Sequence, residues 1–141
     1  LLQYSRETMR NGAPLSKDPN VERLLVDAHI QTHIVRLISM RNYWMFNNKD
    51  KARSTYHGSQ SSLMRKVLTM HMGNVILEVA GPYALLEDPK WAPLKAAFES
   101  HQRESITAHH PGGTTEIQRL IIARRLGLSR TREEAAPAAV A

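Results

Sequence analysis

Two long stretches with apolar residues at helical spacing limit most strongly what this chain can fold into. The first follows Asp18-Pro19, a helix start signal because the aspartate can cap free backbone amides and proline suits the first turn. It should run to about Phe46 and end at the polar run that begins with Asn47. Its apolar stripe consists of Val21, Leu24, Leu25, Ala28, Val35, Leu37, Ile38 and Met45.

A second long helix is predicted to begin at Gly58 and the serines after it and to stop at Gly81-Pro82. Its inward-facing apolar residues are expected to be Leu63, Met64, Val67, Leu68, Val75, Ile76, Val79 and Ala80. A loop of moderate length joins the two long helices, which favours antiparallel packing as neighbours in an up-and-down bundle.

Breakers divide the rest of the chain into shorter segments. The first ten residues look like the last turns of a helix that closes at Gly12, and residues 87–93 read as a surface loop with two prolines. Further helices are predicted from about Leu94 to Ala108 and from Thr115 to about Leu126, the latter closed by Gly127. No alternating strand pattern extends beyond a few residues, so the sequence predicts an all-α fold.

The chain has room for one domain with a real core, since its 141 residues are 42% hydrophobic. We expect a helical-bundle domain over residues 1–130 and a flexible tail over residues 131–141, because the alanine-rich end has little to bury. The chain begins with Leu1, and its first helix shows an end signal without a start signal. We therefore expect it to be a fragment of a longer protein.

Composition excludes several classes of site. The chain has no cysteine, which rules out disulfides, thiolate metal sites and a cysteine nucleophile. No apolar run approaches the roughly 20 residues that span a bilayer, and the first residues lack the pattern of a signal peptide. We expect a soluble protein that does not enter a membrane and is located in the cytoplasm.

The chain is basic, with a formal net charge of +6. Arginines crowd its last quarter, at Arg119, Arg124, Arg125, Arg130 and Arg132. This balance favours anionic partners, which include nucleic acid, phosphorylated cofactors and acidic proteins, although a solvated basic face explains it equally well.

The segment from Pro111 to Leu128 carries the most information. Its two glycines allow a tight turn and a close backbone approach, and the following threonine opens a helix whose amides and dipole favour an anionic or polar group. Thr115 and Gln118 also fit a capping box. Taken alone, a Gly-Gly-Thr-Thr string indicates only the start of a helix.

The whole string resembles the carboxy-terminal signature of the acyl-CoA dehydrogenase family, in which Gly-Thr-Ser/Thr-Glu-Ile-Gln-Arg leads into Ile-Ile-Ala-Arg. Two upstream segments extend the resemblance. Residues 6–19, with Pro14-Leu15 and Asp18-Pro19, are similar to the family's connection between two bundle helices, and residues 79–83 to its helix end and glycine turn. The likeness covers the chain from about Leu1 to Arg130.

The resemblance implies a four-helix bundle that forms the carboxy-terminal part of a larger enzyme and the core of a tetramer. Members hold FAD and oxidise an acyl-CoA to a 2,3-enoyl-CoA: a carboxylate takes the α proton and the β hydrogen leaves as a hydride to the flavin. Electrons then pass to electron-transferring flavoprotein or a similar acceptor. This chain alone is expected to be inactive, and nucleic acid is an unlikely partner of such a protein.

The resemblance also implies site residues. Thr114 and Glu116 match family positions that contact FAD. Gly81 and Pro82, with Glu78 one turn earlier, match the turn that approaches the FAD of the adjoining subunit.

One position departs from the family pattern. Many members carry the catalytic glutamate immediately before the Gly-Thr pair, where this chain has Gly112. Either the base lies upstream of Leu1, as in a known branch of the family, or the chain belongs to the noncatalytic subunit of a heteromeric enzyme. A third hypothesis, from a different class, is a basic helical module that binds nucleic acid or an acidic protein.

Other candidates have simpler explanations. His29 and His33 are four residues apart, as two metal ligands on a helix could be, but no motif supplies a third ligand, and no metal site is expected. His109-His110 could touch a substrate, although plain loop histidines explain them as well. Met64, Met70 and Met72 are expected in the bundle core. The aromatic residues Tyr43, Trp44 and Phe46 are expected to pack against another domain or subunit.

Overall fold

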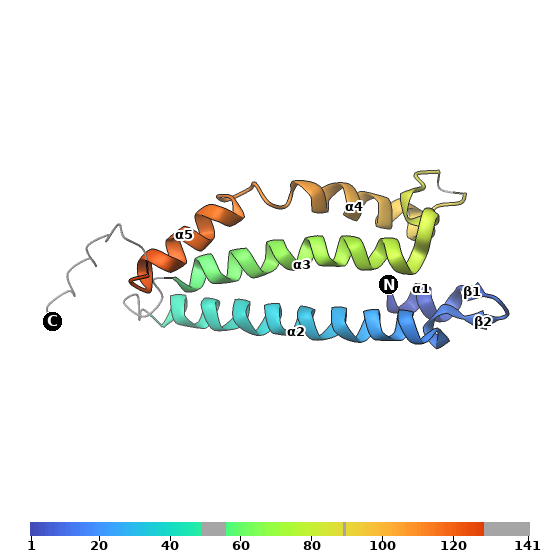
Figure 1. Ribbon diagram of the computed structural model, residues 1–141, viewed down its shortest axis with the longest axis horizontal. Helices are drawn as coiled ribbons and strands as arrows, with labels where there is room; N and C mark the ends of the chain where they lie inside the picture. Colours follow the sequence, from blue (N-terminus) through green and yellow to red (C-terminus); the bar gives the residue numbers. More distant parts are fainter. Residues whose placement is uncertain (49–55, 89, 129–141) are drawn as a thin grey trace, which may run out of the picture. The chain divides into compact units, whose positions relative to one another are not determined.

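A computed structural model describes residues 1–48, 56–88 and 90–128 of the chain (Figure 1). The elements follow in the order α1 (Leu2–Glu7), β1 (Met9–Arg10), β2 (Ala13–Pro14), η1 (Leu15–Lys17), α2 (Pro19–Asn47), α3 (His57–Ala80), η2 (Gly81–Leu85), η3 (Pro93–Ala96), α4 (Ala97–Thr107) and α5 (Thr115–Arg125). The described chain is helical apart from its loops and one two-stranded sheet, which confirms the all-α prediction. No described helix has both the length and the apolar character needed to cross a membrane.

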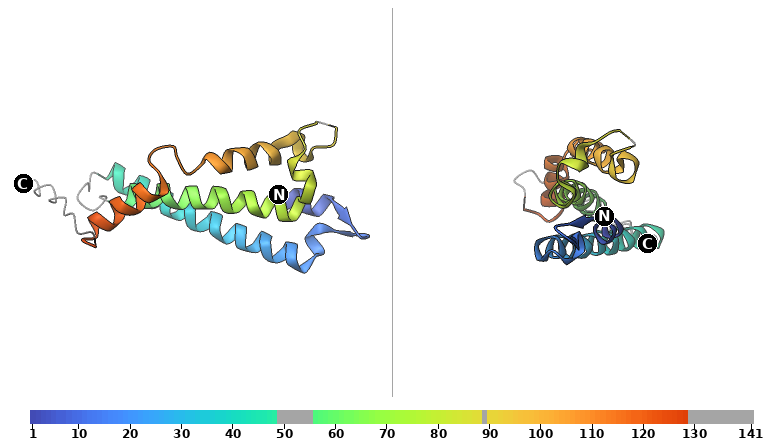
Figure 2. Two further views of the ribbon diagram at one scale, coloured as in Figure 1. Left: turned by 45° about the horizontal axis from the view of Figure 1, so that its top comes forward. Right: turned by 90° about the vertical axis from the view of Figure 1, so that its right-hand side faces the viewer.

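The chain divides into two compact units. Unit 1 comprises Leu1–His33 and Val67–Ala108, and unit 2 comprises Ile34–Lys66 and His109–Ala141, described as far as Leu128. Helices α2 and α3 are continuous (Figure 2). The boundary between the units falls within each of them, so each helix supplies residues to both units.

Local signals explain the boundaries of the two long helices. The Asp18 carboxylate accepts the backbone N–H of Asn20 at 2.8 Å, and proline occupies the first helical position, as predicted. At the other end of α3, Gly81 has φ +61°, a left-handed conformation that lets the chain leave the helix before Pro82. The predicted end of α2 near Phe46 and the predicted stop of α3 at Gly81 are both confirmed.

The first turn of the chain differs from the prediction. Helix α1 ends at Glu7, and the strands β1 and β2 then pair as an antiparallel hairpin in the register Met9↔Pro14. Asn11 and Gly12, with φ +53° and +82°, form its two-residue turn. Gly12 is therefore a hairpin residue rather than a helix stop, because the twist of a two-residue hairpin requires positive φ at both central positions.

The start of α4 also differs. A helix was expected from about Leu94, but Leu94, Lys95 and Ala96 have φ of +50°, +57° and +64°, and α4 begins at Ala97. Each left-handed non-glycine residue costs roughly 1 to 2 kcal/mol. Shortly after these residues, Phe98 is buried, and its ring meets that of Tyr4 edge-on at 5.1 Å.

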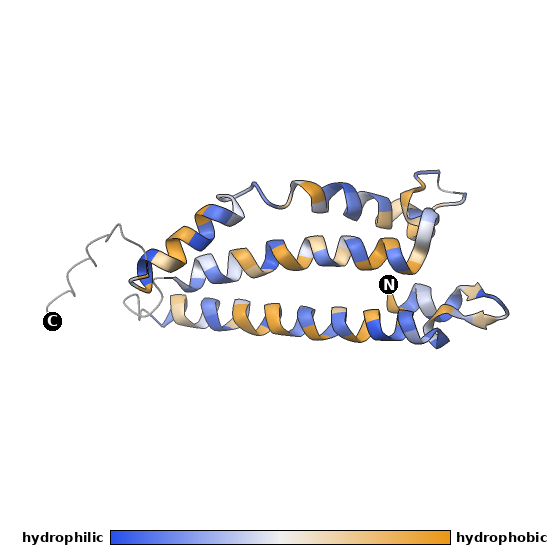
Figure 3. Cartoon of the chain, in the orientation of Figure 1, coloured by the Kyte–Doolittle hydropathy of each residue, from blue (hydrophilic) through white to orange (hydrophobic). Residues whose placement is uncertain are grey.

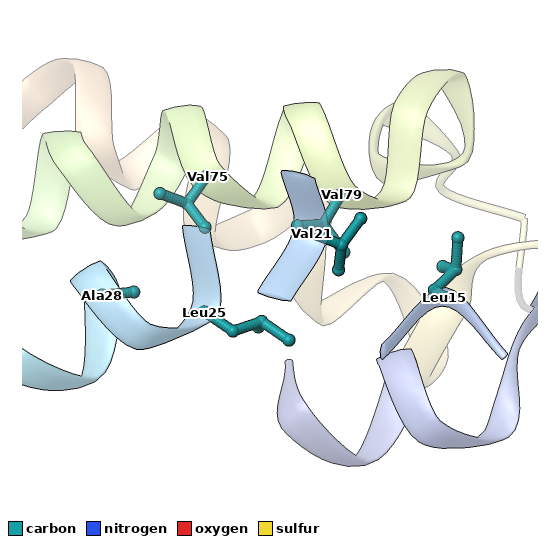
Figure 4. Packing of buried hydrophobic residues seen from close by; sticks show 6 residues of the cluster. All are labelled: Leu15, Val21, Leu25, Ala28, Val75 and Val79. Carbon is teal, nitrogen blue, oxygen red and sulfur yellow. The ribbon is translucent and has the colours of Figure 1, made fainter. Parts of the chain in front are cut away.

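The interior of unit 1 is apolar. Its main cluster consists of Leu15, Val21, Leu25, Ala28, Val75 and Val79 (Figure 4). A second cluster, made of Ile76, Ala80, Ala84 and Phe98, packs under η2 and α4. The predicted inward face of α3 is therefore confirmed in its second half. The loop over residues 87–93 is irregular as predicted, with Pro89 outside the described residues, but Ala92 is buried.

Unit 2 has a mixed interior. Apolar Val35 and Met45 of α2 are buried, together with polar residues of α3 and α5, namely His57, Ser61, Lys66, Thr115 and Gln118. Two predicted core residues are exposed instead. Leu37 of unit 2 follows buried Val35 by two positions and so lies on nearly the opposite side of the helix. Val67 directly follows buried Lys66 in sequence and is the first residue of the second segment of unit 1.

Candidate functional site

The loop before α5 has a conformation that depends on its glycines. Gly112 and Gly113 have φ of +69° and +88°, where other residues are strained. A Cβ on Gly113 would also lie 3.0 Å from Nε2 of Gln118. The two glycines therefore let the chain turn tightly into the first turn of α5.

A buried lysine holds this loop from the side of α3. The Lys66 ammonium donates to the backbone carbonyls of His109 at 3.2 Å, Pro111 at 2.7 Å and Gly113. Only 7% of Lys66 is exposed. An ammonium has three N–H donors, so these three carbonyls use all of them, which is the condition for burying such a charge without a large penalty.

A glutamine holds the loop from the side of α5. Buried Gln118 donates from Nε2 to the carbonyl of Gly112 at 2.7 Å. The expected capping box of Thr115 and Gln118 is therefore wrong. The helix cap is Thr114, whose hydroxyl oxygen accepts the backbone N–H of Ile117 at 3.3 Å, while the Gln118 side chain turns back into the loop.

A chain of hydrogen bonds links three side chains at the start of α5. Thr115, 2% exposed, donates its hydroxyl hydrogen to the Glu116 carboxylate at 2.8 Å. Nδ1 of His109 lies 3.3 Å from the same hydroxyl, and it must be the donor there because Thr115 has only one hydrogen to give. Thr115 thus joins a loop histidine to an exposed carboxylate.

The same bond perturbs the carboxylate. The hydrogen bond from the Thr115 hydroxyl is the largest of the effects that lower the pKa of Glu116 below its ordinary value. The backbone N–H of Glu116 and the side chain of Thr114 lower this pKa as well. Arg119, with Nη1 3.8 Å from Glu116 Oε1, adds a smaller attraction. Glu116 is consequently a charged acceptor on the first turn of α5.

The predicted site residues fall into two groups. Thr114 and Glu116 lie together at the start of α5 in unit 2. Glu78, Gly81 and Pro82 lie together in unit 1, where α3 gives way to η2, and Glu78 and Pro82 are exposed there. Just before this turn, the carbonyl of Val79 accepts a hydrogen bond of 3.0 Å from the Arg10 side chain of β1, which ties the hairpin to the end of α3.

The histidines considered as ligands do not gather. The rings of His29 and His33 lie 4.4 Å apart on α2, and His110 is exposed in the loop. Within residues 1–48, 56–88 and 90–128, no group of three or more His, Cys, Asp or Glu side chains could hold a metal ion.

Sequence reasoning missed Lys66 and misread the roles of Gln118 and Thr115. The available signal for Lys66 was its position on α3 among residues predicted to face inward, next to Met64 and Val67. Lysine is almost never fully buried without a partner, so its residue type gave no reason to expect it in the interior. Its partners are backbone atoms 43 to 47 residues away, which no local pattern reveals.

The outer face of α2 in unit 2 is apolar and exposed. It is formed by Leu37, Met40, Tyr43 and Trp44, each more than half exposed. Phe46 is exposed too, but it follows Trp44 by two positions and so lies on nearly the opposite side of the helix. The hydropathy colouring shows hydrophobic residues along this part of α2 (Figure 3). Exposed apolar residues that share one side of a helix are candidates for an interaction surface, and the packing of the three aromatic residues against another domain or subunit stays a prediction.

The arrangement limits the chemistry of the loop. Glycine at position 112 offers no group that could abstract a proton. The hydroxyl of Thr114 and the carboxylate of Glu116 are hydrogen-bonding groups, and they stand at a helix start where backbone amides and the dipole also favour a polar ligand. Position 112 itself therefore supplies no base, and the groups gathered at the start of α5 can donate and accept hydrogen bonds.

Comparison with known proteins gives one family and several similar structures. The family model for the acyl-CoA dehydrogenase C-terminal domain matches residues 1–127. One solved structure is a FAD-dependent dehydrogenase, with 20% identity and a TM-score of 0.78 over 91% of this chain. Another is the FAD complex of PigA, with 21% identity and a TM-score of 0.75 over 90%. At these identities the likeness concerns the fold.

A third structure is the ChsE4-ChsE5 complex from Mycobacterium tuberculosis, with 25% identity and a TM-score of 0.79 over 93% of this chain. This chain covers only 32%, 31% and 33% of the three structures, in the order given. No curated protein matches the sequence.

Proposed function

We propose that this chain, which belongs to the acyl-CoA dehydrogenase family by its C-terminal domain, is part of a FAD-dependent enzyme that oxidises acyl-CoA to 2,3-enoyl-CoA. In that enzyme the chain contributes contacts to FAD and a surface for oligomer formation. The proposed domain covers residues 1–130, and the proposed tail over 131–141 lies outside the described residues. The acceptor of the electrons is a flavoprotein such as electron-transferring flavoprotein.

The observation that carries this proposal is the glycine loop with the two side chains that follow it. Thr114 and Glu116 occupy the first turn of α5, and Lys66 and Gln118 hold the loop that leads there. FAD carries hydroxyl groups, ring N–H groups and phosphates, which are the partners that a hydroxyl, a carboxylate and helix amides can bind. The residues present therefore fit the cofactor.

FAD, when bound, supplies the acceptor for the β hydrogen, which leaves as a hydride. The α proton needs a base, and Gly112 stands where many family members have a glutamate. We propose that the base comes from another part of the enzyme. A second candidate function, favoured by the same glycine, is that of a noncatalytic subunit in a heteromeric dehydrogenase.

Assembly is proposed to use the exposed apolar face of α2. Leu37, Met40 and Trp44 recur at three- and four-residue steps, so they lie on one side of the helix, and Tyr43, three residues after Met40, extends this side. Aromatic residues and methionine are enriched in the buried parts of protein interfaces. This face therefore suits a helix of another subunit.

The first test is the absorbance spectrum of the intact protein that contains this chain, followed by titration with acyl-CoA thioesters of several lengths. We expect visible flavin absorbance and its bleaching by at least one thioester. Flavin that stays oxidised with every thioester would support the noncatalytic subunit. Absence of flavin would contradict the proposed function, and salt-sensitive binding to a DNA duplex would then favour the nucleic-acid module.

The second test removes the two proposed FAD contacts. In the intact protein, Thr114→Ala combined with Glu116→Ala should weaken FAD binding roughly tenfold or more, because each lost hydrogen bond leaves a cofactor group unpaired. The matched control is Thr107→Ala with Glu104→Ala, an exposed pair on α4 whose threonine hydroxyl donates to the carbonyl of residue 104. Equal flavin retention in both double variants would remove Thr114 and Glu116 from the site.

A further inference from the structure

We propose that Lys66 is a positioning residue: its buried ammonium holds the glycine loop in the conformation that presents Thr114 and Glu116 to FAD. This inference rests on the proposed function for the role of Thr114 and Glu116. The way in which Lys66 holds the loop does not depend on it.

The first step is the pattern of carbonyls. Lys66 takes those of His109, Pro111 and Gly113, which alternate along the chain, so the loop directs every second carbonyl towards one ammonium. The positive φ of Gly112 and Gly113 is part of the backbone shape that brings the carbonyls together. The two glycines and Lys66 therefore fix the backbone of the loop together, although Lys66 lies on α3.

The second step is the burial of the charge. Lysine is rarely buried, and an ammonium removed from water needs all of its donors satisfied. Here the partners are backbone oxygens, and an ammonium bound in this way restrains the path of the chain itself. A neutral side chain at position 66 would leave three carbonyls of the loop without their partner, so the loop should change its path to reach water.

The third step connects the loop to the proposed site. Gly113, the last residue that Lys66 binds, directly precedes Thr114, the cap of α5. On the other side, Gln118 fixes the carbonyl of Gly112. The backbone is thus restrained from α3 and from α5 at the point where the two proposed FAD contacts begin. Hydrogen-bond geometry tolerates only small displacements, so a shifted loop should lower FAD affinity.

The experiment uses Lys66→Met and Lys66→Arg in the intact protein. Met has a similar length and no charge, whereas Arg keeps the charge but spreads its donors over a planar group that cannot converge on the same three carbonyls. We expect FAD binding to weaken about tenfold or more in Lys66→Met, and by a smaller factor in Lys66→Arg. Amide hydrogen exchange should accelerate in residues 112–117 of both variants.

The matched control is Ser61→Ala. Ser61 is also a buried polar residue of α3, but its hydroxyl bonds to that of Ser39 on α2 at 3.1 Å, not to the loop. The FAD affinities of Ser61→Ala and Lys66→Met are compared at temperatures at which the two variants are equally stable. If Lys66 contributes only to general stability, the two affinities should then be equal. That result, or unchanged flavin binding in Lys66→Met, would overturn the proposal.

Two further outcomes remain decisive. If Lys66→Met does not fold, Lys66→Arg decides, and unchanged FAD affinity and unchanged exchange in that variant overturn the proposal. If the wild-type protein holds no flavin, the proposed function fails, and exchange over residues 112–117 then decides separately whether Lys66 holds the loop.

Discussion

The two units of this chain are held together by different kinds of interior. Unit 1 buries aliphatic and aromatic side chains, with Leu15 and Val79 almost completely enclosed. Unit 2 buries Lys66, Thr115 and Gln118, and each of these bonds to atoms of the loop and first turn at the start of α5. The same two long helices supply both units, so the difference arises from the side chains and not from the architecture.

The two kinds of interior have different physical effects. Apolar contacts are non-directional, so an apolar core stabilises a unit but tolerates small displacements within it. Hydrogen bonds are directional, and a buried polar group that loses its partner is strongly penalised. A polar interior therefore specifies where a loop lies, and in this chain it does so beside the candidate binding residues.

The largest expected effect comes from emptying the apolar core of unit 1. Leu15→Ala should lower the free energy of unfolding by about 2 to 5 kcal/mol, because it leaves a cavity against Val21 and Val79. Native-state hydrogen exchange of the intact protein measures this effect region by region. The control is Leu85→Ala, an exposed leucine of η2, for which a change within about 0.5 kcal/mol is expected.

An intermediate effect is expected from the polar interior of unit 2. Gln118→Ala should destabilise the start of α5 by about 1 to 3 kcal/mol, because the carbonyl of Gly112 loses its partner. Exchange should accelerate in residues 111–117 while the amides of unit 1 keep their protection. The exposed Gln3, which bonds to Glu7, offers a control, since Gln3→Ala should leave exchange at α5 unchanged. Acceleration spread evenly over both units would break the comparison between them.

The smallest expected effect concerns the charge of Glu116. Its lowered pKa means that the charged form is favoured in the folded state, so its contribution to stability is present above pH 4.5, the ordinary value, and is lost as the pH falls through the lowered pKa. Thr115→Val removes the principal cause and should raise the pKa of Glu116 towards 4.5, as followed by NMR titration of the side-chain carboxyl. In the control Thr107→Val the pKa of Glu116 should not move. A pKa that is equally low in Thr115→Val would show that another group is responsible.

Some elements were predictable because their causes are local. Asp18 and Pro19 act within one turn, and the family signature lies within consecutive residues, so both the start of α2 and the family assignment follow from the sequence. The turn at Asn11-Gly12 is also local but ambiguous, since a glycine with positive φ serves a helix end and a hairpin equally well. The left-handed residues before α4 have no local signature at all.

The sequence by itself determined that this chain is all-α, where its two long helices end and which family it belongs to, because propensity, capping and periodicity act over a few neighbouring residues. Only the tertiary structure decided that Lys66 turns inward, that Gln118 reaches back to Gly112 and that Thr114, not Thr115, caps α5. The first two features depend on where backbone carbonyls lie in space, and Lys66 and its partners are far apart in sequence, whereas the cap depends on which of two adjacent threonines meets the free amide of Ile117. The physical reason is that burial of a polar group is favourable only where its partners already stand, which folding alone establishes.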